Sequence, residues 1–444
     1  MTVDRSSNDP VVVVTADTHV APRLDHLRPF CDEKYLEDFD ALAASAFPIY
    51  TRDNPEFVKF FGGDVDAAGE WLDTYLRNAA GVGGLYDIDA RLSDLDFDGV
   101  AGEVLFHGTP EADGAVSQIP FQASEIITEG PKAGTSELTT VGCQIYNRWL
   151  ADFCSEQPER HVGLCQIPVP DIDASVELIR WAAENGLRGV NFPALRESAP
   201  SFNDPMWDPI FSASVDLDMP LVTHLGAGSF PPIQVGPGAP AIYQLESPAV
   251  GARSLWHMIF GGVFDRHPNL KLVLTEIPGN WFASALPDME SVFDARINGG
   301  PMLRRYLKKR PGEYVTENVY FGCSFMSRSE ALLAVDLGLS ERVMWGSDYP
   351  HPEGTWFYYD EDDADRTSTT KLSLASTFAG FAEPVVRGMT GGNAIECFGL
   401  DAGALAKVAA RIGPSLEEIT TAPDPALVPA DYPGLGFRTV GAWG

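Results

Sequence analysis

Four short apolar runs of the chain each end in a side chain type that binds metal ions or carries protons in enzymes. The runs and the residues that end them are residues 11–14 with Asp17 and His19, residues 220–223 with His224, residues 272–275 with Glu276, and residues 343–347 with Asp348. Imidazole nitrogen and carboxylate oxygen form a ligand set suited to zinc, and they also hold manganese, iron or cobalt. The four ends therefore predict a metal-dependent site if the fold brings them together.

The pattern of the chain predicts the elements that would bring them together. Short β-branched or apolar runs predict strands at residues 11–16, 100–106, 162–168, 187–192, 219–224, 270–275, 318–323 and 342–347. Helical patterns between them lie at residues 146–156, 174–184, 208–215, 254–265 and 327–336. This alternation favours a closed (β/α)8 TIM barrel over a doubly wound open sheet. The carboxyl ends of barrel strands form one ring, so the polar ends would share one site.

Longer segments predict loop insertions in the barrel. Residues 24–84 form an elaborated excursion after the first strand, and residues 109–140 and 226–248 are predicted loops that cover the site. We expect one catalytic barrel domain over residues 11–400. A C-terminal helix and Pro-rich tail, residues 401–444, are expected to pack on that barrel.

The composition excludes several kinds of partner. The chain has 63 acidic and 31 basic residues and a formal charge of -32, which argues against nucleic acid as a partner. No apolar run reaches the roughly 20 residues that span a bilayer, and the first ten residues do not resemble a signal peptide. We therefore expect a soluble cytoplasmic protein that has no membrane partner and acts on a small molecule. The six cysteines form no C-x-x-C pair and are expected to be reduced thiols.

Each polar strand end also has a purely structural explanation. Asp17 could cap a turn, and Glu276 could cap the helix that follows it. His19 could be a satisfied histidine beneath a loop, and Asp348 could organise the Ser-Asp-Tyr-Pro turn. The coincidence of all of them at strand ends favours the catalytic explanation.

Four motifs of the chain are Asp17-Thr18-His19, Tyr146-Asn147-Arg148-Trp149-Leu150, residues 261–271 and residues 346–354. These motifs resemble the metal-dependent amidohydrolase superfamily, and within it the Amidohydrolase 2 branch that contains aminocarboxymuconate semialdehyde decarboxylase and the resorcylate-type decarboxylases. The resemblance implies a (β/α)8 barrel and a homodimer. It also implies that His19, His224 and Asp348 are metal ligands.

Two positions depart from the pattern of that family. Ala21 stands where the first-strand motif often has a second histidine, so Asp17 is a candidate ligand in its place. Glu276 stands where several members have a histidine at the end of the sixth strand. The carboxylate of Glu276 must then bind the metal or move protons itself.

The function expected first is that of a metal-dependent hydrolase acting on a cyclic or aromatic carbonyl compound. His19, His224 and Asp348 would hold the ion, with Asp17 or Glu276 completing the ligand set. Zinc is the ion expected first, and manganese or iron would also fit. A water activated by the metal would attack the carbonyl carbon, with His224, Glu276 and Asp348 as the catalytic residues.

Two alternatives stay open on the sequence. The first is a non-oxidative decarboxylase or C–C bond-cleaving enzyme that acts on a carboxylated aromatic or ring-fission product. Arg196 or Arg253 would then bind a carboxylate of the substrate, and His107 or His351 would contact the substrate or move protons. The second is a barrel that binds a small molecule without catalysis, since two histidines of the family pattern are missing.

Overall fold

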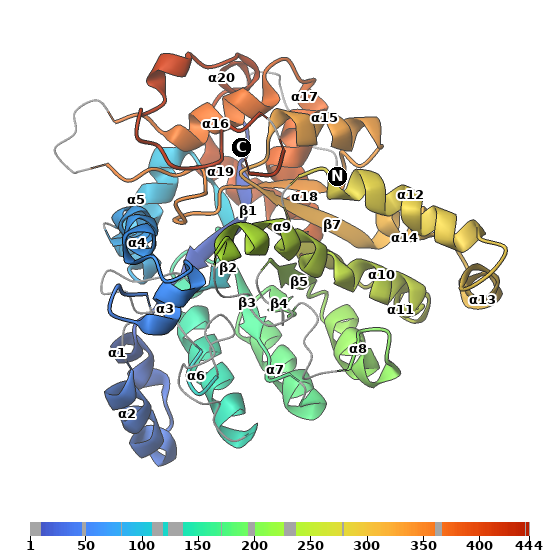
Figure 1. Cartoon of the computed structure of the whole chain (residues 1–444), viewed down its shortest axis with the longest axis horizontal. Helices are drawn as coiled ribbons and strands as arrows, with labels where there is room; N and C mark the ends of the chain where they lie inside the picture. Colours follow the sequence, from blue (N-terminus) through green and yellow to red (C-terminus); the bar gives the residue numbers. More distant parts are fainter. Residues whose placement is uncertain are drawn as a thin grey trace.

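A computed structural model describes residues 10–46, 50–80, 82–108, 119–122, 136–169, 171–193, 200–225, 237–277, 279–359, 366–439 and 441–443. Parallel strands in the order β1 to β8 form a barrel (Figure 1), which confirms the predicted fold. The strands are β1 Val14–Val20, β2 Gly102–His107, β3 His161–Gln166, β4 Gly189–Asn191, β5 Leu221–His224, β6 Leu272–Thr275, β7 Val319–Ser324 and β8 Val343–Gly346. Each of them overlaps a predicted strand.

Helices follow every strand and surround the barrel. Those of the first half are α1 Leu24–Leu27, α2 Leu36–Ser45, α3 Pro55–Phe60, α4 Val65–Ala80, α5 Ile88–Asp98, α6 Ser136–Ser155, α7 Ile172–Glu184 and α8 Asp208–Asp216. Those after β5 and β6 are α9 Ala239–Gly251, α10 Arg253–Phe260, α11 Val263–Arg266, α12 Trp281–Asp294, α13 Gly300–Tyr306 and α14 Pro311–Asn318. The last are α15 Arg328–Asp336, α16 Thr369–Phe378, α17 Glu383–Arg387, α18 Asn393–Phe398, α19 Ala402–Ile412 and α20 Leu416–Thr420.

The barrel closes between β1 and the segment after β8. Thr18 forms a parallel bridge with Tyr349. The amide of Asp348 donates to the carbonyl oxygen of Asp17 at 2.9 Å, and the amide of His19 donates to that of Tyr349 at 2.7 Å. Two of the predicted strand ends thus lie side by side because the backbone itself joins them.

A β-bulge in β1 turns its polar residues into the barrel. Val14 and Ala16 pack in the interior cluster with residues of the other strands, among them Val104 and Phe106. The pairing of β1 with β2 shifts between Thr15 and Thr18, so that β1 has one residue more than β2 there. An extra residue reverses the alternation of side chains, and Asp17 and His19 face inward above the apolar interior.

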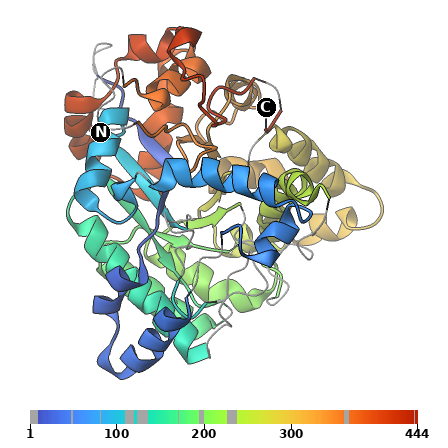
Figure 2. The same cartoon turned by 60° about the vertical axis from the view of Figure 1, so that its left-hand side comes forward.

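Side-chain caps and glycines fix the helix ends near the barrel. Asp171 accepts a hydrogen bond from the amide of Ala174 at the start of α7. After α7, Gly186 has a φ of 87°, a left-handed conformation that suits glycine and ends the helix. The segment after β1 contains α1 to α5, and Figure 2 shows the blue helices α3 and α4 crossing one face beside the green helix α9.

Both loop predictions were wrong at their C-terminal ends. Residues 136–140 are the first turns of α6, and residues 239–248 belong to α9. Pro240 lies in the first turn of α9, where a missing N–H costs no hydrogen bond, so it starts the helix. Residues 109–118, 123–135 and 226–236 lie outside the described residues.

The C-terminal helix predicted within residues 401–444 is α19, Ala402–Ile412. Leu405 and Val408 of α19 pack against the interior cluster that holds Val12 and Val14, at the amino end of the barrel. Burial of such side chains stabilises the fold by about 1.5–3 kcal/mol each. The division into domains at residue 400 stays a prediction. Within the described ranges, no helix has the length and apolar content needed to cross a membrane.

Candidate metal centre

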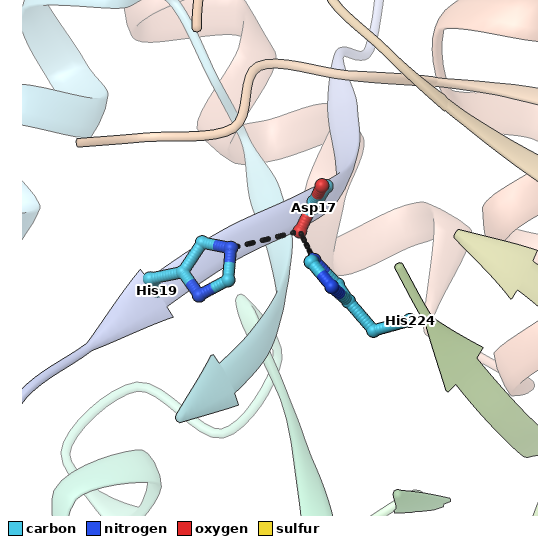
Figure 3. A group of neighbouring side chains, drawn as sticks. All are labelled: Asp17, His19 and His224. Atoms are coloured by element: carbon cyan, nitrogen blue, oxygen red, sulfur yellow. Dashed lines mark ion pairs between the residues drawn. The ribbon is translucent and has the colours of Figure 1, made fainter. Parts of the chain in front are cut away.

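Asp17, His19 and His224 converge at the carboxyl end of the barrel (Figure 3). Asp17 and His19 come from β1, and His224 is the last residue of β5. Oδ1 of Asp17 lies 3.5 Å from Nε2 of His19 and 3.4 Å from Nε2 of His224. All three residues are buried. The structure therefore brings these sequence-predicted residues into one group.

Asp348 and Glu276 border the same group. Oδ1 of Asp348 lies 3.2 Å from Nε2 of His19, and Oε2 of Glu276 lies 3.3 Å from Nε2 of His224. Both residues follow a strand end and have a positive φ, 59° for Asp348 and 54° for Glu276. Such backbone is uncommon for a residue with a side chain, and it turns both carboxyl groups toward the barrel axis.

The buried donor atoms of this group fit a divalent metal ion. No hydrogen-bond partner within the described part of the chain is found for Oδ1 of Asp17, Nε2 of His19, Nε2 of His224 or Oδ2 of Asp348. Buried polar atoms without partners cost free energy, and that cost disappears when a cation binds them. Ligands of one ion stand roughly 3 Å apart when each bond is about 2.1 Å long, which agrees with the separations here.

Hydrogen bonds to neighbouring residues orient the side chains of this group. Nδ1 of His224 lies 2.6 Å from the carbonyl oxygen of Leu225, so Nδ1 carries the proton and Nε2 keeps its lone pair for a metal. The hydroxyl of Ser324 donates to Oδ2 of Asp17, leaving Oδ1 directed at the two histidines. The ring of Phe106 lies 4.6 Å from that of His224 and forms an apolar wall beside it.

The carboxyl groups of the site differ in their affinity for protons. Burial raises the pKa of Asp17, but the facing His224 and His19 outweigh it and hold that pKa well below its usual range. Burial, and then the neighbouring carboxylates of Asp348, Asp17 and Glu353, raise the pKa of Glu276 well above its usual range. Asp17 is thus suited to bind a cation, and Glu276 to hold a proton.

A buried ionic network contacts β1 and holds it in place. Glu103 on β2 accepts hydrogen bonds of 2.7 Å from Nε and from Nη2 of Arg91, and Nδ1 of His161 lies 2.9 Å from its Oε1. Nη1 of Arg91 donates to the carbonyl oxygen of His19 at 2.8 Å. The hydroxyl of Thr18 donates to Glu103 at 2.9 Å. The backbone that carries Asp17 and His19 is therefore held by the buried guanidinium group of Arg91.

His351 and His107 also lie at this end of the barrel. His351 stacks on His19 with ring centres 3.9 Å apart, and its Nδ1 lies 2.9 Å from Oδ1 of Asp348. Burial lowers the pKa of His351, but Asp348 outweighs this and the pKa rises to about 9. His107, at the end of β2, has its Nδ1 3.3 Å from Nδ2 of Asn191. Contact of these two histidines with a substrate stays a prediction.

Of the two arginines proposed for substrate binding, only Arg253 belongs to the described part of the chain. Arg253 is exposed at the start of α10. Arg196 lies outside the described residues. Their roles stay predictions.

Two residues near the metal centre were missed by sequence reasoning. The carboxyl of Glu353 lies with those of Glu276 and Asp348, and each offers an oxygen within 4.8 Å of the others. Burial raises the pKa of Glu353 to about 7. Glu353 belongs to the motif at residues 346–354, which was the available signal. Ser324, the hydroxyl donor to Asp17, carries no comparable signal, because serine at a strand end is common.

A family model described as amidohydrolase matches residues 60–400. The chain belongs to this amidohydrolase family. The match covers most of the barrel and includes β2 to β8, and with them His224, Glu276 and Asp348. The resemblance stated from the motifs is confirmed.

Known relatives of this amidohydrolase include two decarboxylases. The 2-amino-3-carboxymuconate-6-semialdehyde decarboxylase of Dictyostelium discoideum is 30% identical over 264 residues, 58% of this chain and 66% of that protein. The gamma-resorcylate decarboxylase of Rhodococcus jostii (strain RHA1) is 28% identical over 254 residues, 52% of this chain and 74% of that protein. The match with the first relative thus spans just under two thirds of its length.

Solved structures share the fold of this amidohydrolase. A dihydroxybenzoic acid decarboxylase from Polaromonas sp. JS666, with bound manganese and the inhibitor 2-nitroresorcinol, superposes with a TM-score of 0.54. Its sequence is 18% identical, and the alignment covers 89% of this chain and 99% of that one. Such a likeness shows a common barrel, and its ligands are properties of that protein.

Proposed function

We propose that this amidohydrolase-family chain is a metal-dependent, non-oxidative decarboxylase of hydroxylated aromatic carboxylates. The observation that carries the proposal is the buried group of donor atoms from Asp17, His19, His224 and Asp348, with the carboxyl group of Glu276 beside it. The decarboxylases among the relatives favour loss of carbon dioxide over the hydrolysis expected first. An intact donor set also argues against the non-catalytic barrel.

Each residue of the donor set would supply one ligand atom to a divalent ion. Asp17, His19 and His224 would supply one oxygen and two nitrogens, and Asp348 would supply a second carboxylate. The bound ion would attract electron density from a substrate carboxylate and the neighbouring hydroxyl oxygen. The stacked ring of His351 would keep Asp348 and His19 in place.

Glu276 is the residue we assign to proton transfer. When the bond between the ring and the carboxylate breaks, carbon dioxide leaves and the bonding electron pair stays on the ring carbon. That carbon takes the proton of the Glu276 carboxyl, and solvent then returns a proton to Glu276. Position supports the assignment, because Glu276 lies next to His224 and is buried from bulk water.

Aromatic side chains around the centre suit a flat substrate. Phe106 lies against His224 on one side. Burial, and then the charges of Glu276, Tyr50 and Glu353, raise the pKa of Tyr243 of α9. Tyr243 therefore keeps its proton and can donate a hydrogen bond to a substrate oxygen.

The finer properties of the protein stay predictions. A mixed nitrogen and oxygen ligand set accepts zinc, manganese or iron. Zinc was expected first, and the manganese in the Polaromonas relative makes manganese an equal candidate. The homodimer and the cytoplasmic location are expectations that sedimentation and fractionation would test.

Product analysis with the metal-loaded protein tests the proposed function. The protein would be given zinc or manganese and incubated with ortho-hydroxybenzoates in heavy water, beside the Asp348→Asn variant. The wild-type protein should release carbon dioxide and leave one deuterium on the ring carbon that carried the carboxylate. The Asp348→Asn variant should be inactive. Hydrolysis of esters or amides while every carboxylate stays intact would overturn the proposal.

A further inference from the structure

The C-terminal segment of residues 431–439 and 441–443, called the C-terminal strap below, lies on the loops that follow β6, β7 and β8. This red segment follows α20, and in Figure 2 it ends close to the yellow helix α12. Each of the three loops carries a residue at or next to the metal centre: Glu276 after β6, Ser324 at the end of β7 and Glu353 after β8.

The contact with the β7 loop is a buried ion pair. Arg438, buried to 7% exposure, donates to the carbonyl oxygen of Phe325 and to Oε2 of Glu330. Its guanidinium also lies 5.1 Å from the centre of the Phe325 ring. Phe325 directly follows Ser324, the residue that donates to Asp17, and has a φ of 40°. Arg438 thus fixes the peptide next to a residue that orients a ligand.

Glu330 extends this contact to the β6 loop. Its Oε1 accepts a hydrogen bond from the amide of Gly279, and its Oε2 accepts one of 2.7 Å from the amide of Ser327. Gly279 lies three residues after Glu276, and a Cβ added to it would stand 3.0 Å from that of Ala442 in the strap. Arg438 and Glu330 together therefore tie the β6 loop to the β7 loop.

The strap holds the β8 loop through its backbone. The amide of Leu435 donates to the carbonyl oxygen of Glu353 at 2.8 Å. The hydroxyl of Tyr432 donates to the carbonyl oxygen of Gly354. A Cβ added at Gly434 would collide with that same oxygen, so the strap and the loop touch backbone to backbone.

We propose that Arg438 is a positioning residue of the metal centre, which it sets by locking the C-terminal strap onto the three loops that carry Glu276, Ser324 and Glu353. This inference rests on the proposed metal site. The acidic partner of this buried arginine also binds a second loop, and a buried charge pair is costly to separate, so a displacement of the strap would move both loops. The strap acts through these loops and touches no substrate.

Two substitutions test the strap by different means. Arg438→Ala removes the ion pair, and Gly434→Ala pushes the strap off the β8 loop. Their matched controls are Arg411→Ala, an arginine of α19 with a 60% exposed side chain, and Gly299→Ala, where an added Cβ meets nothing within 4 Å. The measurements are hydrogen exchange of the three loops and Mn²⁺ affinity by calorimetry, both well below the unfolding temperature.

Both test variants should speed amide exchange in residues 276–281, 325–330 and 351–355 at least tenfold, while residues 161–166 of β3 stay protected. We also expect Mn²⁺ to bind about tenfold more weakly, as for other residues that support metal ligands, with Arg438→Lys restoring part of the affinity. A lower unfolding temperature with unchanged loop exchange and unchanged affinity would overturn the proposal.

Loop exchange and Mn²⁺ affinity distinguish a failure of this inference from a failure of the proposed function. If the wild-type protein binds Mn²⁺ but decarboxylates nothing, exchange and affinity still decide the role of Arg438. If the wild-type protein binds no metal, the assigned metal centre fails and this inference fails with it. If Arg438→Ala does not fold, Gly434→Ala carries the same comparison, since it retains the buried Arg438.

Discussion

Nε2 of His224 lies 3.4 Å from Oδ1 of Asp17, across the barrel between the end of β5 and β1. This separation is longer than an ordinary N–H···O hydrogen bond, and both atoms lack a hydrogen-bond partner in the described structure. Two buried atoms that face each other at this distance without a hydrogen bond can both bind one metal ion. This relationship makes metal binding the first property to test.

Asp17→Asn should weaken metal binding at least tenfold, because the amide removes the negative charge that the two histidines face. Isothermal titration with Mn²⁺ and Zn²⁺ measures the change. The control is Asp53→Asn, an exposed carboxyl before α3. Unchanged affinity in Asp17→Asn would remove this residue from the ligand set.

Glu276→Gln should lower kcat by about 10²–10⁴ while metal content stays near that of the wild type, because the amide cannot supply the proton. Steady-state kinetics and elemental analysis of the same preparation give both values. Glu70→Gln, a change on the exposed surface of α4, is the control. Loss of the metal together with the activity would instead identify Glu276 as a ligand, and activity within a few-fold of wild type would exclude both roles.

Glu103→Gln should destabilise the protein by about 3–5 kcal/mol, because it leaves the buried Arg91 without a countercharge. Denaturant unfolding of the metal-free protein measures the free energy of unfolding. Asp40→Asn breaks the exposed Arg28–Asp40 pair, whose atoms are 2.7 Å apart, and should cost less than about 1 kcal/mol. Equal effects of the two substitutions would contradict the role given to the buried network.

We expect the buried carboxyl group of Asp98 to make a pH-dependent contribution to the free energy of unfolding. Burial raises the pKa of Asp98 to about 6, although Ser368 and Thr370 donate hydrogen bonds to it. A carboxyl with a raised pKa binds its proton more tightly in the folded state. Its contribution to the free energy of unfolding is therefore most favourable below pH 4 and declines as the pH rises to 6.

The Asp98→Asn variant removes this titration. Relative to the wild type, its free energy of unfolding should rise by about 3 kcal/mol between pH 4 and pH 7, the equivalent of two pKa units. Denaturant unfolding at several pH values, with Asp53→Asn as control, measures the difference. Parallel profiles for the wild type and Asp98→Asn would contradict the expectation.

The sequence by itself determined the barrel and predicted most residues of the candidate metal centre. Strands are short apolar runs, and a polar residue at the end of such a run is visible in the sequence wherever the run lies. His224 and Asp348 were predicted this way, because the closed barrel leaves only one place where the carboxyl ends of its strands can meet. The same local rule explains why every predicted strand has a counterpart in the structure.

The tertiary structure alone decided how these residues face the centre and what holds them. The bulge in β1 and the positive φ of Glu276 and Asp348 depend on pairing between strands. The places of Ser324, Glu353 and Arg438 depend on contacts across the chain, such as that of Arg438 with Phe325. Periodicity reports only which neighbours in sequence share a face. It carries no information on which distant segments pack together, and that packing supplies the hydrogen bonds that aim each ligand.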